Sequence, residues 1–338
     1  MPGTLDVPPF EPHPLLRGGH AQTIAGRYFP GPKARLDATT QVIELPDSAR
    51  LSALETIPPG WVEGDPAAIM LHGLAGCARS SFVVRTASRL ARSGVRVVRL
   101  NMRNAGDGFG LAKGFYHSGR TDDVRNVVEW MARRAPGSPI ALVGFSLGGN
   151  LALKLAAEAA IDPLDALDCV VAANPPIDLA ACSKLLERKE NQKYDRHFAR
   201  LLRGQVERLH KCFPELGTID LSSVETVRRF DERYTAPRNG FVDADDYYER
   251  SSSARILDRI QIPGLVVHAA DDPFIPVEPF REARFPAEIE LELLSHGGHI
   301  GYLSKNQWDG DRRWLDKRLA VWLAKRWKNV FATRAAMC

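Results

Sequence analysis

Serine 146 lies in a five-residue pattern that is typical of an enzyme nucleophile, Gly144-Phe145-Ser146-Leu147-Gly148. The apolar residues 139–143 before it predict a buried strand, and residues 150–160 after it, rich in Leu, Ala, Lys and Glu, predict a helix. Between a strand and a helix, the glycines permit a strained turn that holds the serine hydroxyl above the sheet. A loop serine without chemistry is the alternative, because the bare pattern also occurs by chance, but this context favours a nucleophile.

A nucleophilic serine needs a base, and the base needs a carboxylate that orients it. The apolar residues 264–269 predict another buried strand, and Asp271 and Asp272 follow its end. We prefer Asp272 as the triad acid, because a short apolar run and then Pro276 follow it. Asp271 remains the alternative. The aspartate that is not the acid is expected to form a turn before Pro273.

A histidine for the base follows the next predicted strand. Residues 288–294 alternate Glu with Ile and Leu, which predicts a half-exposed strand, and a glycine-rich loop with His296 and His299 comes after it. We prefer His299, because Gly298 and Gly301 leave room for a close approach to the serine. His296 is expected to be structural. A metal shared by the two histidines is not expected, because no third ligand is indicated.

An oxyanion hole is predicted after a further buried strand at residues 67–71, where the chain continues as His72-Gly73-Leu74-Ala75-Gly76. We expect the backbone N–H groups of Leu74 and Leu147 to stabilise a developing alkoxide. A tight turn without this function is the alternative. His72 is expected to support the loop rather than to react.

Further stretches spread along the chain carry a family resemblance. They are Leu16-Arg17-Gly18-Gly19-His20-Ala21-Gln22-Thr23, His72-Gly73-Leu74, Asn101-Met102-Arg103-Asn104-Ala105-Gly106, Tyr116-His117-Ser118-Gly119, Asp271-Asp272-Pro273-Phe274 and His296-Gly297-Gly298-His299. With the serine motif, they resemble the YheT-like group of α/β-hydrolases, which includes plant embryogenesis-associated and animal membrane-anchored proteins. The resemblance implies a serine hydrolase that acts on esters, in some members on lipids. Animal members carry an N-terminal membrane anchor, and nothing in this sequence is expected to serve as one.

Predicted strands and helices alternate from residue 67 to residue 328, which indicates a mostly parallel sheet with helices on both faces. The fold class expected is therefore α/β, with the α/β-hydrolase fold, in one domain over residues 1–338. The other predicted strands are residues 95–100 and 168–173, and the other predicted helices are residues 122–134 and 312–327. Residues 41–45 and 50–56 are expected to pair as antiparallel strands at the sheet edge.

Residues 174–253 interrupt this alternation and are expected to form a helical cap insertion. Apolar residues recur there at helical spacing: Tyr194, Phe198, Leu201, Leu202, Val206, Leu209 and Phe213. One interpretation is a helix that is simply packed against the protein. The other is a cap whose apolar face covers the nucleophile and contacts an acyl chain, and the two interpretations are compatible. The arginines between them are Arg196, Arg200, Arg203 and Arg208. We expect a solvated face, with a site for an anionic substrate group as the alternative.

The composition is that of an ordinary globular protein, with 338 residues, 44% hydrophobic and 25% charged. A net charge of +4 is too small to indicate nucleic-acid binding. The five cysteines have no paired or metal-binding spacing, the N-terminus does not have the form of a signal peptide, and no apolar run is long enough to cross a bilayer. We therefore expect a cytoplasmic protein. The oligomeric state is left open.

Three other polar features have structural interpretations. Arg103 is expected to hold loops together through hydrogen bonds, and His20 to be structural or to line the pocket. His117 to Asp122 fits the H-x-x-x-x-D pattern of acyltransferases, but residues 121–123 also fit the start of a helix.

Together, these residues predict a serine esterase without a metal or organic cofactor, acting on a small-molecule ester with an acyl chain. Ser146 attacks, His299 is the base and Asp272 orients it. An acyltransferase or thioesterase that uses the same triad, and a non-catalytic scaffold, are the alternatives.

Overall fold

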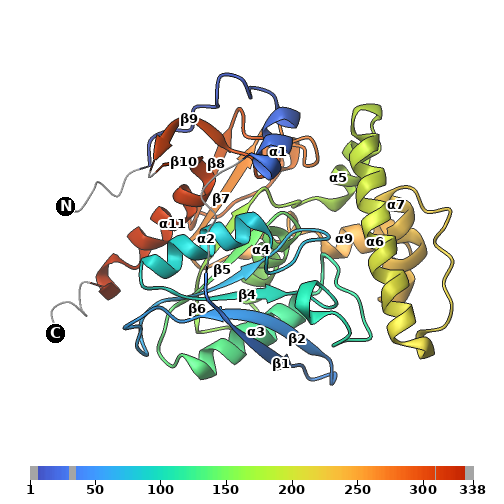
Figure 1. The fold of residues 1–338 in the computed structure, drawn as a ribbon, viewed down its shortest axis with the longest axis horizontal. Coiled ribbons are helices and arrows are strands. Elements are labelled where there is room, and N and C mark those ends of the chain that lie inside the picture. Colours follow the sequence, from blue (N-terminus) through green and yellow to red (C-terminus); the bar gives the residue numbers. More distant parts are fainter. Residues whose placement is uncertain (1–6, 30–35, 309, 332–338) are drawn as a thin grey trace.

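An eight-stranded sheet forms the centre of the protein (Figure 1), in the strand order β1-β2-β4-β3-β5-β6-β7-β8. The computed structural model describes residues 7–29, 36–308 and 310–331, so Cys338 lies outside the described residues. The strands are β1 Thr39–Glu44, β2 Arg50–Thr56, β3 Ala67–Leu71, β4 Arg96–Asn101, β5 Ile140–Phe145, β6 Leu167–Ala173, β7 Gly264–Ala269 and β8 Ile289–Leu294. β1 and β2 pair antiparallel at one edge, and β2 also pairs antiparallel with β4. The pairs from β4 to β8 are parallel, as expected.

Helices cover both faces of this sheet, which explains why its central strands are apolar throughout. Helices α3 (Thr121–Arg134) and α4 (Leu147–Glu158) pack in one hydrophobic core, and α2 (Ser81–Arg92) and α11 (Trp314–Arg326) in the other. β3, β4, β5 and β7 are buried at every position. A parallel strand between two helical layers has no solvent-facing side, so it requires a continuous apolar run. The predicted α/β-hydrolase fold is confirmed.

Some elements differ from the prediction. The last helix begins at Trp314 rather than at residue 312, because Asp311–Arg313 form strand β10, which pairs with β9 (Leu303–Trp308). A helix before the sheet, α1 (Gly19–Tyr28), was not predicted. Its sequence is interrupted by glycines, and a buried Gln22 replaces the apolar residue that an amphipathic pattern would show.

The segment between β6 and β7 holds a group of helices that stands beside the sheet (Figure 1). Its elements are α5 Leu179–Leu186, α6 Gln192–Cys212, α7 Val227–Phe230, a π-helical turn at Asp231–Thr235, α8 Ala236–Arg238 and α9 Ala244–Ser251. The long helix predicted here is α6. It buries Leu202, Val206 and Leu209, whereas Leu201 is exposed on its outer side. Within the described ranges, no helix combines the length and the apolar character needed to cross a bilayer.

Candidate active site

Ser146 lies in the sharp turn between β5 and α4, with backbone angles φ 52° and ψ −124° that are strained for any residue with a side chain. The turn is so tight that its glycines cannot be replaced. A Cβ on Gly144 would lie 2.2 Å from the carbonyl oxygen of Gly148, and a Cβ on Gly148 would lie 2.6 Å from the carbonyl oxygen of His72. The strand and helix are thus held close together, with Ser146 at the turn that joins them.

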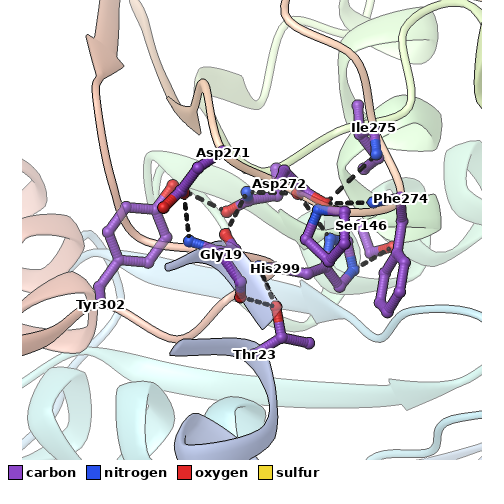
Figure 2. Close-up of polar contacts among 12 residues, drawn as sticks. Gly19, Thr23, Ser146, Asp271, Asp272, Phe274, Ile275, His299 and Tyr302 are labelled. Carbon is purple, nitrogen blue, oxygen red and sulfur yellow. Dashed lines mark hydrogen bonds and ion pairs between the residues drawn. The ribbon is translucent and has the colours of Figure 1, made fainter. Parts of the chain in front are cut away.

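Three side chains that the sequence analysis selected meet at this turn (Figure 2). The His299 Nε2 atom lies 3.0 Å from Ser146 Oγ, and its Nδ1 atom lies 2.8 Å from Asp272 Oδ2. An ionised carboxylate only accepts hydrogen bonds, so the His299 proton is on Nδ1. Nε2 is then free to accept the proton of the Ser146 hydroxyl. Asp272 is fully buried, while the His299 side chain is 13% exposed.

The Asp272 carboxylate receives a full set of donors. Its Oδ1 atom accepts from the backbone N–H groups of Phe274, at 2.8 Å, and Ile275, at 3.2 Å, and its Oδ2 atom also accepts from Asn174 Nδ2, at 2.7 Å. Burial alone would raise the pKa of Asp272, but the neighbouring His299 and these donors outweigh it, so the pKa lies below its usual value. The Asp272 carboxylate therefore stays ionised beside His299.

Asp271, the alternative acid, points elsewhere. Its Oδ1 atom accepts from the backbone N–H of Gly298 at 2.8 Å, and its Oδ2 atom lies 3.3 Å from His296 Nδ1. Asp271 and His296 therefore brace the loop that carries His299, and the structure brings Asp272 rather than Asp271 to His299 Nδ1.

Sequence reasoning missed three residues that hold this arrangement. The Thr23 hydroxyl on α1 accepts from the backbone N–H of His299 at 2.8 Å (Figure 2). Asn174 also donates to the carbonyl of Gly298, at 3.1 Å, and accepts from the hydroxyl of buried Tyr302, at 3.0 Å. Thr23 lies in the N-terminal stretch quoted above, so that resemblance contained a signal for it. Nothing in the local sequence marks Asn174 or Tyr302.

The residues predicted to supply the oxyanion donors, Leu74 and Leu147, lie beside Ser146. Leu147 is the first residue of α4, so its N–H has no partner within the helix. Among the described residues, neither this N–H nor that of Leu74 donates to a protein acceptor. A Cβ on Gly73 would lie 3.1 Å from the Cβ of Ser146, so the turn that carries Leu74 runs directly against the serine.

Buried His72 supports this turn, as expected. Its Nδ1 atom bonds the carbonyl of Gly73 at 2.8 Å, and its Nε2 atom accepts from the backbone N–H of Met102 at 3.2 Å. Burial lowers the pKa of His72 to about 4, so it is neutral and keeps this pair of bonds at physiological pH.

Comparison with known proteins agrees with this geometry. A family model described as the alpha/beta hydrolase fold matches residues 66–306. YheT of Escherichia coli (strain K12) is 33% identical over 310 residues, which cover 90% of this chain and 89% of that protein. The chain belongs to the YheT-like group of the α/β-hydrolase fold family.

Other relatives of this α/β-hydrolase point the same way. Phospholipase ABHD3 of Mus musculus is 30% identical over 256 residues, which cover 75% of this chain and 62% of the phospholipase. The esterase Pf2001 of Pyrococcus furiosus superposes with a TM-score of 0.59 over 88% of this chain and 92% of its own, at 17% identity, which shows the shared fold. The chain is thus a hydrolase-family protein of the esterase and lipase type.

A mostly apolar cavity of about 820 Å³ opens at the serine of this hydrolase. Ser146, His299, Leu74 and Leu147 line it, together with residues of the β6–β7 segment. Aromatic rings connect that segment to His299: Tyr194 on α6 packs edge-on against Phe274 at 4.7 Å, and Phe274 packs against the His299 ring at 4.8 Å. The helices between β6 and β7 therefore form one wall of the cavity.

The other polar residues of the sequence analysis have structural surroundings. Buried Arg103 makes a two-pronged ion pair with Asp123 and a third bond to Asp47, so it does join loops. Exposed His20 stacks on Tyr194, and its Nδ1 atom lies 3.2 Å from the Tyr194 hydroxyl. In the described part of the chain, no group of three or more His, Cys, Asp or Glu side chains is arranged to hold a metal ion.

The H-x-x-x-x-D pattern does not form a pair. His117 is buried at the cavity wall, whereas Asp122 is exposed in the first turn of α3. Burial, together with the charge of Arg120, lowers the pKa of His117 to about 3.

Proposed function

We propose that this protein hydrolyses carboxylic esters with an acyl chain, using Ser146 as nucleophile. Nε2 of His299 takes the hydroxyl proton as Ser146 Oγ attacks the acyl carbonyl carbon. Asp272 holds the Nδ1–H tautomer and stabilises the imidazolium. His299 then gives the proton to the leaving alcohol, which departs from the acyl-enzyme. A water molecule, deprotonated by the same histidine, releases the acid.

The N–H groups of Leu74 and Leu147 are proposed to bind the oxyanion of each tetrahedral intermediate. Leu147 lies at the N-terminus of α4, where the helix dipole favours negative charge. Donors without a protein partner are already oriented in the ground state, so they need no rearrangement as the charge develops. We also propose that residues 174–253 act as a cap, since their helices wall the cavity, and that the acyl chain lies in its apolar part.

The observation that carries the proposal is the hydrogen-bonded series Ser146, His299 and Asp272, with distances of 3.0 and 2.8 Å, at the opening of an apolar cavity. Only a serine that has lost its proton to a base is a strong nucleophile. A serine with only a structural role would not require a strained turn, a buried ionised carboxylate and a histidine that links the two.

A fluorophosphonate probe tests this proposal, because it reacts with an activated serine and remains bound. The native protein should be labelled at Ser146, and the Ser146→Ala variant should not be labelled. Labelling of both proteins would place the reactive group elsewhere. Melting temperatures show whether both proteins are folded. If both are folded with the same Tm and neither is labelled, the chain is a non-catalytic member of the fold.

A further inference from the structure

Among the described residues, four cationic side chains line the cavity without an ion-pair partner. They are Arg27 on α1 and Lys193, Arg196 and Arg200 on α6, and we call them the basic rim. The three on α6 are spaced at i, i+3 and i+7, so they lie on one side of the helix. The next stripe of the same helix, Tyr194, Phe198 and Leu202, is apolar and also lines the cavity.

The basic rim is unpaired, unlike the other cations near the site. None of its members forms an ion pair with a carboxylate among the residues that the structure describes. Arg200 lies 3.2 Å from His197 Nδ1, and Arg27 lies over the ring of its neighbour Tyr28. By contrast, Arg85, the fifth cation of the cavity lining, is bonded to Asp316 at 2.5 Å.

Among the described residues that line the cavity, the acidic group available to neutralise the rim is buried and already hydrogen-bonded. This group is the carboxyl of Asp231, which accepts from the hydroxyls of Thr235, at 2.7 Å, and Tyr248, at 2.9 Å. Burial raises the pKa of Asp231 to about 7, so much of it is uncharged at neutral pH. The rim therefore carries a net positive charge.

The charges of the two helices act on one another. Burial lowers the pKa of His197, and the charges of Arg200 on its own helix and of Arg27 on α1 lower it further. The contact of His20 with Tyr194 also joins α1 to α6. Like charges held together without a counter-ion repel each other, and a bound anion would remove this cost.

This arrangement suits an amphiphilic anion. Tyr194 begins the apolar stripe and contacts the ring of Phe274, which packs on His299. The rim residues on α6 are therefore close to the groups proposed to react. We propose that the basic rim binds an anionic group, a phosphate or a carboxylate, on the alcohol part of the substrate, while the acyl chain occupies the apolar interior. This inference rests on the proposed ester hydrolysis and defines its substrate class.

Two substrates that differ only in the anion test the inference. They are 1-octanoylglycerol 3-phosphate and 1-octanoylglycerol, both used as monomers below their aggregation concentrations, with release of octanoate as the measurement. We expect kcat/KM to be about tenfold higher for the phosphate ester, from two or more exposed ion pairs. The preference should shrink as added salt screens the charges. Equal rates for the two esters would overturn the inference but leave the proposed hydrolysis intact, whereas no cleavage of either would contradict both.

Matched variants on one helix locate the anion site. The double variant Arg196→Gln, Arg200→Gln should reduce the preference for the phosphate ester about fivefold, mainly through KM. The control is Arg208→Gln, because Arg208 stacks on Phe109 and does not line the cavity. It should keep the native preference. An equal loss in both variants would mean that the overall charge of the protein, not the rim, attracts the substrate.

A lipid surface carries the same phosphate chemistry as a single ester, so binding to vesicles is measured as a second arm. Vesicles of phosphatidylcholine with and without phosphatidylglycerol are sedimented with the native protein and with the double variant. If the double variant loses vesicle binding but keeps the native preference between the monomeric esters, the rim docks on membranes and the inference is wrong.

Discussion

Replacing Asp272 by asparagine should remove nearly all activity without unfolding the site. The carbonyl of the new side chain would take the place of Oδ1, since it can still accept from the N–H groups of Phe274 and Ile275. The NH₂ group of the same amide would then take the place of Oδ2, where it meets two donors, Asn174 Nδ2 and the Nδ1–H of His299.

The histidine can escape this clash only by changing its tautomer. With the proton on Nε2, the Nδ1 atom of His299 accepts from the new amide, but Nε2 can no longer take the proton of Ser146. Asn174 cannot turn its amide instead, because its Oδ1 atom accepts from Tyr302 and its Nδ2 atom donates to Gly298. In serine proteases the same exchange lowers kcat by about 10⁴-fold, and we expect a loss of similar size.

The matched control is Asp271→Asn. The asparagine keeps an acceptor for the backbone N–H of Gly298 and loses only its charge opposite His296, so kcat should fall by less than about tenfold. Steady-state hydrolysis of a p-nitrophenyl ester by both variants, with melting temperatures to show that they are folded, measures the difference. A larger loss in Asp271→Asn than in Asp272→Asn would refute the assignment of the triad acid.

Three further predictions concern glycine substitutions, the titration of Asp231 and the acyl length of the substrate. Gly148→Ala should abolish activity and lower Tm, because the new Cβ would lie 2.6 Å from backbone oxygens at the end of the neighbouring strand. Gly204 lies within α6, and a Cβ there would meet no other atom, so Gly204→Ala should stabilise the protein by about 0.5–1 kcal/mol. Burial raises the pKa of Asp231 to about 7, so its proton is held more tightly in the folded than in the unfolded state. The free energy of unfolding should therefore fall by about 2.5 kcal/mol as the pH rises from 5 to 8. Denaturant unfolding of Asp231→Asn should lack this part of the pH dependence; an identical slope in both proteins would contradict the raised pKa. On p-nitrophenyl esters, activity should rise with acyl length, by about 0.8 kcal/mol per buried CH₂, until the cavity is filled. Leu202→Phe should move the optimum to shorter chains, and an unmoved optimum would exclude Leu202 from the acyl site.

The parallel sheet was predictable because its strands have a strong local signal. Residues 67–71 and 140–145 are apolar at every position, and each is followed by a glycine-rich turn. A strand buried on both faces needs such a run, and the turn chemistry that follows it is also local. The β9–β10 hairpin and α1 were missed because neither has a clear period. β9 mixes Lys, Asn and Gln with apolar residues, and α1 depends on a buried Gln22.

The type and order of the proposed catalytic residues could also be anticipated, because each follows the end of a predicted strand. Carboxyl ends of neighbouring parallel strands meet at one edge of the sheet, so Ser146 and the loops of Asp272 and His299 had to come close. The choice between adjacent aspartates was weaker. It rested on the residues that follow them, while the direction of each carboxylate depends on contacts with Asn174 and Gly298, which are distant in sequence.

The sequence by itself therefore determined the fold family, the strained serine turn and the short list of candidates for acid and base, since these depend on local patterns of glycine and apolar residues. Only the tertiary structure decided which aspartate faces His299 and that Thr23, Asn174 and Tyr302 hold the site. It also decided that α1 and α6 bring unpaired cations to one cavity. The physical reason is that hydrogen-bond partners, burial and charge neutralisation are set by residues far apart in the chain, and no local pattern encodes them.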